Sequence, residues 1–193
     1  MKNLKIITLT LISLLFIACG GETSAPTNTN KLQSYETAEK TTQDEILEAI
    51  NKARSVARDC KDGNGLVSAA PALTWNDELY AAAYEHSHDL AQSDTFSHYG
   101  SGTASDITGA NNNTTSYFNE RIKANGYTNY RTIGENIAGG QATIQEAVEA
   151  WLASPAHCTN IMNPQFQEIG VAIVSNNESE YGIYWTQNFG AKK

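Results

Sequence analysis

The feature that most constrains the fold is a late change in the spacing of apolar residues. In the first part of this 193-residue chain, apolar side chains recur every three or four positions, as at Leu79, Ala83 and Leu90. Near the end, residues 168–174 and 181–189 alternate with a period of two around a polar turn, the pattern of a strand pair. Helices followed by a C-terminal hairpin predict an α+β fold with an antiparallel core sheet.

Capping signals place the expected helices. They are expected over residues 42–58, from Asn76 onward, over 117–125, and from Thr143 to a point before Pro155. On the second helix, the apolar spacing turns His86 toward the core and His88 toward solvent. The stretch 99–115 is rich in Gly, Ser, Asn and Thr, so we expect a long loop there.

The N-terminus carries an export signal. Lys2 and Lys5 precede an apolar run over residues 6–17, which is shorter than the roughly 20 residues that span a bilayer. The run ends in FIAC, which looks like a bacterial lipoprotein signal in which Cys19 becomes the lipidated first residue. We therefore expect a signal peptide over 1–18 and a membrane anchor through lipid on Cys19. A plain secretory signal and an uncleaved anchor are the alternatives.

The remaining chain is expected to form a tether and one domain. Residues 19–41 are polar and predict a flexible linker, and residues 42–193 have the size of a single domain. No Asp follows Cys19 to indicate inner-membrane retention, so we expect a lipid-anchored protein of the outer membrane or cell surface. The formal net charge of −8 excludes a nucleic-acid partner, which would require a basic surface.

Three short segments suggest one polar pocket: FSH ending at His98, IGENIAGG around Glu135, and WLASPAHCTNIMNP around His157. Two imidazoles and a carboxylate can bind Zn²⁺ and leave one coordination position open, or they can act as general acid and base on a substrate. A polar network that only orders loops is the structural alternative. Gly134 and the pair at 139–140 predict tight turns next to the glutamate. No nucleophile in these segments has a convincing base, so binding is favoured over catalysis.

Two cysteines remain after Cys19. Cys60 and Cys158 lie in an exported chain, so we expect them to form a disulfide. The alternative is a nucleophilic Cys158 beside His157. It is disfavoured because adjacent residues rarely point their side chains toward each other. A catalytic cysteine needs its base within hydrogen-bonding distance of the thiol.

The order of the motifs resembles a known extracellular family. LTWNDELYAAAYEHSHDLA, FSH, GENIAGG, AWLASPAHCTNIMNPQFQEIGVAI and YWTQNFG are similar to segments of the CAP superfamily, which includes cysteine-rich secretory, antigen 5 and pathogenesis-related proteins. The resemblance is strongest to its bacterial SCP-like branch and covers about Thr42 to Gly190. It implies a three-layer α-β-α sandwich with a mostly antiparallel central sheet. It also implies a cavity with two histidines and two acids, of which His98, His157 and Glu135 match three.

The fourth cavity position does not transfer directly. The resemblance places the second acid shortly after the first histidine, where this chain has its long loop, so Asp106 is the first candidate and Glu120 the second. Members of the superfamily are linked with lipid binding, defence and host interaction. We therefore expect a binding module for a small apolar ligand, a peptide or a glycan. A metal-dependent, peptidase-like hydrolase using the same groove and a structural envelope protein are the alternatives.

Overall fold

The structure is a computed structural model that describes residues 42–193. The expected signal peptide over 1–18, the lipidation site Cys19 and the linker over 19–41 lie outside the described residues. Within the described part of the chain, no helix has both the length and the apolar character needed to cross a membrane.

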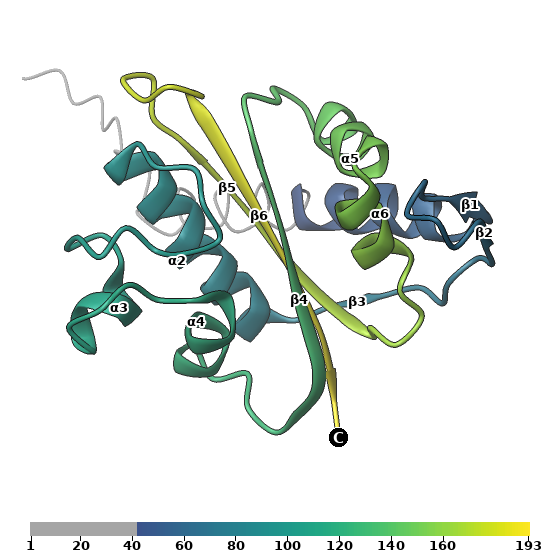
Figure 1. The fold of residues 1–193 in the computed structure, drawn as a ribbon, viewed down its shortest axis with the longest axis horizontal. Coiled ribbons are helices and arrows are strands. Elements are labelled where there is room, and N and C mark those ends of the chain that lie inside the picture. The colour runs from purple at the N-terminus through teal and green to yellow at the C-terminus, as the bar shows by residue number, and fades with distance from the viewer. Residues whose placement is uncertain (1–41) are drawn as a thin grey trace, which may run out of the picture. The chain divides into compact units, whose positions relative to one another are not determined.

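The domain has three layers, with a sheet between two groups of helices (Figure 1). One face of the sheet carries α2 (Asp77–Ser93), α3 (Ile107–Asn111) and α4 (Phe118–Ala124). The other face carries a helix over 42–54, α5 (Ile144–Ala153), α6 (Pro155–Met162) and a small hairpin of β1 (Arg58–Asp59) and β2 (Leu66–Val67). This arrangement confirms the predicted α+β, α-β-α sandwich.

The central sheet has the strand order β3-β5-β6-β4. Its strands are β3 (Thr74–Trp75), β5 (Glu168–Ser175), β6 (Ile183–Lys192) and β4 (Tyr130–Gly139). The expected C-terminal hairpin is the antiparallel pair β5–β6, and β4 is antiparallel to β6. Only the two-residue β3 runs parallel to its neighbour, β5. The sheet is therefore mostly antiparallel, as predicted.

Strand β4 shows that the expectation of turns was wrong at Gly134 and Gly139 and correct at Gly140. Gly134 and Gly139 both lie within this extended strand. A Cβ atom on Gly134 would lie 2.8 Å from Phe166 Cζ, and one on Gly139 would lie 2.8 Å from Tyr181 Cγ. These two positions require glycine because aromatic rings pack directly on the strand backbone. The chain turns at Gly140, whose φ is +90°.

The outer edge of β4 is covered by side chains from the neighbouring helices. Trp151 Nε1 of α5 donates to Ile137 O at 3.0 Å, and Asn160 Nδ2 of α6 donates to Glu135 O at 3.2 Å. These bonds satisfy two carbonyl groups that have no partner strand on that side. They also fix α5 and α6 against the strand that carries Glu135.

The sequence predicts where helices begin more accurately than where they end. Asn76 Oδ1 accepts from Leu79 N at 3.0 Å, and Thr143 forms the predicted capping box. The first helix, however, ends at residue 54 instead of near Arg58, which begins β1. After α5, the chain enters α6 directly at Pro155, where the sequence predicts only a helix end. Proline is favourable as the first residue of a helix.

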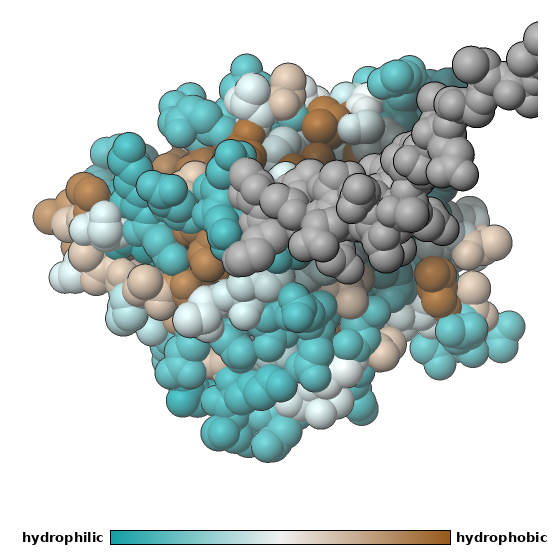
Figure 2. Space-filling model, turned by 180° about the vertical axis from the view of Figure 1, so that it is seen from behind, coloured by the Kyte–Doolittle hydropathy of each residue, from teal (hydrophilic) through white to brown (hydrophobic). Residues whose placement is uncertain are grey.

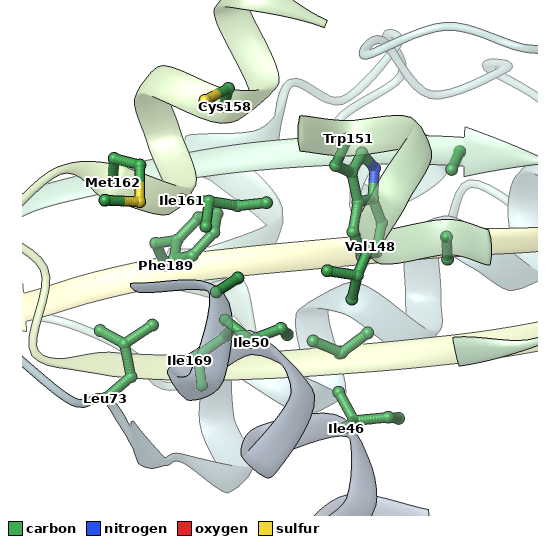
Figure 3. Packing of buried hydrophobic residues seen from close by; sticks show 14 of the residues in the cluster. Ile46, Ile50, Leu73, Val148, Trp151, Cys158, Ile161, Met162, Ile169 and Phe189 are labelled. Atoms are coloured by element: carbon green, nitrogen blue, oxygen red, sulfur yellow. The ribbon is translucent and has the colours of Figure 1, made fainter. Parts of the chain in front are cut away.

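The main hydrophobic core lies between the sheet and the layer formed by the first helix, α5 and α6 (Figure 3). Val148 lies beside Trp151 there, Ile50 contributes from the first helix, and Ile169 and Phe189 contribute from the sheet. The predicted disulfide between Cys60 and Cys158 is present, with the Cα atoms 5.5 Å apart. Seen from behind, the described surface is largely hydrophilic, with hydrophobic residues in separate patches (Figure 2).

Arg54 fastens the end of the first helix to α6. Its side chain is fully buried, and its Nε and Nη2 atoms donate to Pro71 O at 2.8 and 2.7 Å. Nη1 donates to the carbonyl groups of Ile161 and Asn163 at the C-terminal end of α6. Burial lowers the pKa of Arg54 to about 10, so the group remains cationic at neutral pH. A cation at this helix end is electrostatically favourable.

Candidate functional site

The structure brings His98 and Glu135 together from segments that are distant in the sequence. His98 lies in the loop after α2, and Glu135 projects from β4. His98 Nδ1 is 2.8 Å from Glu135 Oε1. The glutamate side chain is 1% exposed, whereas that of His98 is 41% exposed. A buried carboxylate therefore orients an imidazole that solvent can reach.

Arg121 of α4 completes this site, and the sequence interpretation missed it. Its Nη2 atom lies 3.0 Å from Glu135 Oε2 and also donates to His98 O at 3.0 Å. Its Nη1 atom donates to Ser116 O and Oγ at 3.2 and 3.0 Å. The guanidinium, 1% exposed, thus joins β4, the His98 loop and the start of α4. The available signal was Glu135 itself, because a buried carboxylate requires a cationic or hydrogen-bonding partner.

The charge on Glu135 depends on these partners. Burial opposes its ionisation, but the neighbouring His86, His98 and Arg121 together hold the pKa of Glu135 below its usual value. His86 cannot supply a lasting positive charge, because burial lowers the pKa of that imidazole to about 4. The permanent cation is the Arg121 guanidinium. Glu135 is therefore an ionised, buried acceptor at neutral pH.

His86 lies beneath the pair on the inner face of α2, as the helical spacing predicted. Its side chain is 0% exposed, with Nε2 at 2.9 Å from Ser97 O and 3.9 Å from Glu135 Oε1. The contact with a carbonyl oxygen assigns the proton to Nε2. Nδ1 has no hydrogen-bond partner within residues 42–193. His88, predicted to face solvent, is half-buried instead and stacks on Tyr84.

The low pKa of His86 predicts a specific loss of stability in acid. An unfolded histidine binds a proton below about pH 6.5, whereas folded His86 does so only near pH 4. The unfolded state is therefore favoured increasingly as the pH falls between these values, by roughly 3 kcal/mol in total. Urea unfolding should show that His86→Gln removes most of this decrease in the free energy of unfolding, while His88→Gln does not. Parallel pH profiles for wild type and His86→Gln would contradict the prediction.

His157 approaches the same region from α6. It is half-buried, and its carbonyl oxygen accepts from Asn136 Nδ2 at 3.2 Å, next to Glu135 on β4. Burial lowers the pKa of His157, and the positive charge that His98 can carry lowers it further. The two imidazoles are therefore within electrostatic reach of each other. At neutral pH the His157 side chain is uncharged, with one ring nitrogen able to donate and the other able to accept.

The two candidates for the second acid have local structural roles. Asp106 is 1% exposed and accepts from the backbone N–H groups of Gly102, Gly109 and Ser116 at 3.0–3.1 Å. Glu120 is exposed and accepts from Tyr117 N at 2.8 Å as part of a capping box. Among the described residues, the structure gives neither carboxylate a hydrogen bond to His98. Both order the loop and helix that follow the first histidine.

The arrangement does not form the zinc site that was predicted at His98, Glu135 and His157. Within residues 42–193, no group of three or more His, Cys, Asp or Glu side chains is placed to hold a metal ion. The physical reason lies in Glu135, because Arg121 contacts both of its carboxylate oxygens and His98 occupies one of them as well. The guanidinium already supplies the positive charge that a metal ion would bring to this carboxylate.

A mostly antiparallel sheet between helical layers is the arrangement that the resemblance to the CAP superfamily implied. Residues 47–189 match the family described as "CAP: Cysteine-rich secretory protein family". The chain belongs to this family.

Two solved structures share this fold. An extracellular protein containing an SCP domain from Bacillus anthracis str. Ames is 27% identical, with a TM-score of 0.50 over 64% of this chain and 35% of that chain. An outer surface protein from Borrelia burgdorferi shares the fold at 21% identity, with a TM-score of 0.55 over 80% of this chain and 92% of that chain.

Two curated relatives come from Bacillus subtilis (strain 168). "Uncharacterized protein YkwD" is 51% identical over 63 residues, which are 33% of this chain and 23% of the relative. "Uncharacterized membrane protein YlbC" is 27% identical over 117 residues, which are 61% of this chain and 28% of the relative. The similarity thus spans about a quarter of the length of each curated relative.

Proposed function

We propose that this protein is an extracytoplasmic ligand-binding domain whose ligand contacts His98 and His157. The observation that carries the proposal is the fixed, accessible imidazole of His98. Its Nδ1 is held by the buried Glu135–Arg121 pair, its ring is 41% exposed, and its Nε2 has no hydrogen-bond partner within residues 42–193. A polar group that is already oriented costs little to order when a ligand binds.

A glycan fits the groups available around this imidazole best. Because Nδ1 donates to Glu135, Nε2 of neutral His98 is an acceptor for a hydroxyl group. Tyr99 follows His98 in the chain, is 58% exposed, and lies 4.8 Å from the ring of Tyr117, measured between centroids. The imidazole of His98 offers hydrogen bonds to the hydroxyl groups of a sugar, and the exposed aromatic rings of the adjoining loop offer apolar surface to its ring face. A peptide or a small apolar ligand would use fewer of these groups.

The N-terminal sequence and one relative support a proposal for the location. The Bacillus anthracis relative is described as extracellular, and the FIAC sequence at Cys19 resembles a lipoprotein signal. We propose a lipid-anchored protein of the outer membrane or cell surface. Metabolic labelling with palmitate, compared between wild type and Cys19→Ser, tests the anchor.

Glycan arrays provide the test of binding. Wild type is expected to bind a subset of envelope-type glycans, and His98→Ala and His157→Ala are each expected to weaken binding about tenfold or more, the effect of losing one central contact. Circular dichroism should show that both variants remain folded. His88→Ala is the matched control, because it removes a histidine on the outer side of α2 and should leave glycan binding unchanged.

Three results would overturn this proposal. Selective binding to peptide or lipid arrays would replace the glycan with another ligand class. Unfolding of both His98→Ala and His157→Ala would make the polar cluster structural. Peptide hydrolysis by wild type that disappears in the double variant would make the protein a hydrolase.

A further inference from the structure

A concave site lies on the outer side of α2, next to α3 and α4. It is a groove of about 530 Å³ whose lining includes Tyr80, Tyr84, Glu85, His88, Ile107 and Asn125. Its volume falls within the range of small-molecule pockets, roughly 300–1,000 Å³. The residues of the His98–Glu135 site are not part of its lining. The groove is therefore a separate candidate for ligand binding.

Aromatic rings form a row along one side of this groove. Tyr80, Tyr84 and His88 follow one another at intervals of four residues, which places them on one face of α2. Their ring centroids are 6.4 and 6.1 Å apart, and Trp75 extends the row at 5.6 Å from Tyr80. Tyr84 is 49% exposed. Tyr84 thus presents π-electron surface to solvent, whereas Trp75, at the end of the row, packs against the main core.

One polar group in the groove is the buried carboxylate of Glu85. Glu85 is 8% exposed, and its two oxygens accept from Thr108 N at 2.8 Å and from Asn125 Nδ2 at 2.6 Å. Within residues 42–193, no Lys, Arg or His nitrogen forms an ion pair with it. Within the described part of the chain, these two donors are the hydrogen-bond partners of the carboxylate. A bound cation would offset the cost of burying its charge.

Glu85 differs in this respect from the other buried acids. Asp89 accepts three hydrogen bonds from Ser101 and Ser105, and Asp106 accepts four from loop groups. Neither carboxylate is part of the groove lining. Glu135 is neutralised by Arg121. Glu85 alone among these four combines two accepted bonds, no cation and a place in a solvent-open groove.

We propose that this groove binds a small organic ammonium ion, with the cation over the Tyr84 ring and near the Glu85 carboxylate. Aromatic faces attract ammonium groups through the ring quadrupole, and methylated ammonium groups also gain from contact with the carbon surface. Ile107, 55% exposed at the α3 side of the groove, supplies apolar contact for the substituents on nitrogen. The net charge of −8 for the whole chain favours the approach of a cation.

Choline is a suitable probe, and 3,3-dimethylbutan-1-ol is its neutral analogue of the same shape. In an NMR titration of the full chain, choline should shift the amide signals of Thr108 and the Asn125 side chain in a saturable manner, because both groups donate to Glu85. The neutral alcohol should not reproduce these shifts. Tyr84→Leu should raise the Kd for choline about fivefold, whereas Tyr181→Leu, which removes a tyrosine outside the groove, should leave it unchanged.

Each other outcome would overturn the inference. Equal shifts with the neutral alcohol would show an apolar groove without charge recognition. Absence of saturation with choline would show that no such site exists, and an unchanged Kd in Tyr84→Leu would place binding elsewhere. His98→Ala should not alter the Kd for choline, so failure of this inference is distinguishable from failure of the glycan proposal.

Discussion

Replacing Cys60 and Cys158 with serine is expected to lower the free energy of unfolding by about 4–5 kcal/mol, on the chain-entropy account of disulfides. The two cysteines are 98 residues apart, so the bond restricts a long stretch of the unfolded chain. That stretch includes α2, β4 and α5, and the bond joins the small hairpin to α6. The loss should therefore be large compared with most single substitutions.

Urea denaturation of the oxidised, reduced and doubly substituted proteins measures this effect. Reduced wild type and the Cys60→Ser/Cys158→Ser variant should unfold at the same lower urea concentration. Cys19→Ser is the control, because it removes a cysteine that is not part of the disulfide. A loss below about 1 kcal/mol would contradict the prediction and would indicate that the reduced unfolded chain is already compact.

Removing the Arg121 guanidinium is expected to cost about 3–5 kcal/mol, the range found when one partner of a buried ion pair is deleted. Arg121→Met keeps much of the side-chain volume but leaves Glu135 buried without its permanent cation. The variant also removes the donors to His98 O and to Ser116. The loss should be largest at neutral pH and smaller in acid, because protonation of Glu135 removes the uncompensated charge.

A double-mutant cycle separates the ion pair from the other contacts. Adding Glu135→Gln to Arg121→Met should recover part of the lost stability, because both buried charges are then absent. Lys192→Met is the control for an exposed pair, since Lys192 and Glu78 are 2.8 Å apart but 45% and 41% exposed. Its expected cost is much smaller, because an exposed ion pair is screened by solvent. Fully additive losses at positions 121 and 135 would rule out the coupling.

Local signals in the sequence predicted much of the fold. Asn76 and Thr143 mark helix starts because capping depends on residues only three positions away. The β5–β6 hairpin was predictable because a two-residue period needs no knowledge of the partner strand. β4 was missed for the opposite reason. Its glycines suggested turns, but the rings of Phe166 and Tyr181 that require them come from distant segments.

The candidate site was predictable only where the chemistry was unusual. His98 and Glu135 are noticeable in the sequence as polar groups within distinctive segments. The structure places His98 Nδ1 2.8 Å from Glu135 Oε1. Arg121 follows a glutamate on a short polar helix, and its sequence context does not distinguish it from a surface arginine. The zinc interpretation depended on a free Glu135 carboxylate. Because Arg121 comes from another element, the sequence could not reveal that this carboxylate was occupied.

The side-chain bonds from Trp151 and Asn160 to the outer edge of β4 also affect how copies of this protein meet. An unprotected edge would allow a strand from an adjacent copy to join the sheet and begin aggregation. Here the incoming strand would first have to displace an indole and an amide that already hold two of the carbonyl groups it needs. At high concentration, copies of the domain should therefore not associate by adding a strand at this edge of the sheet.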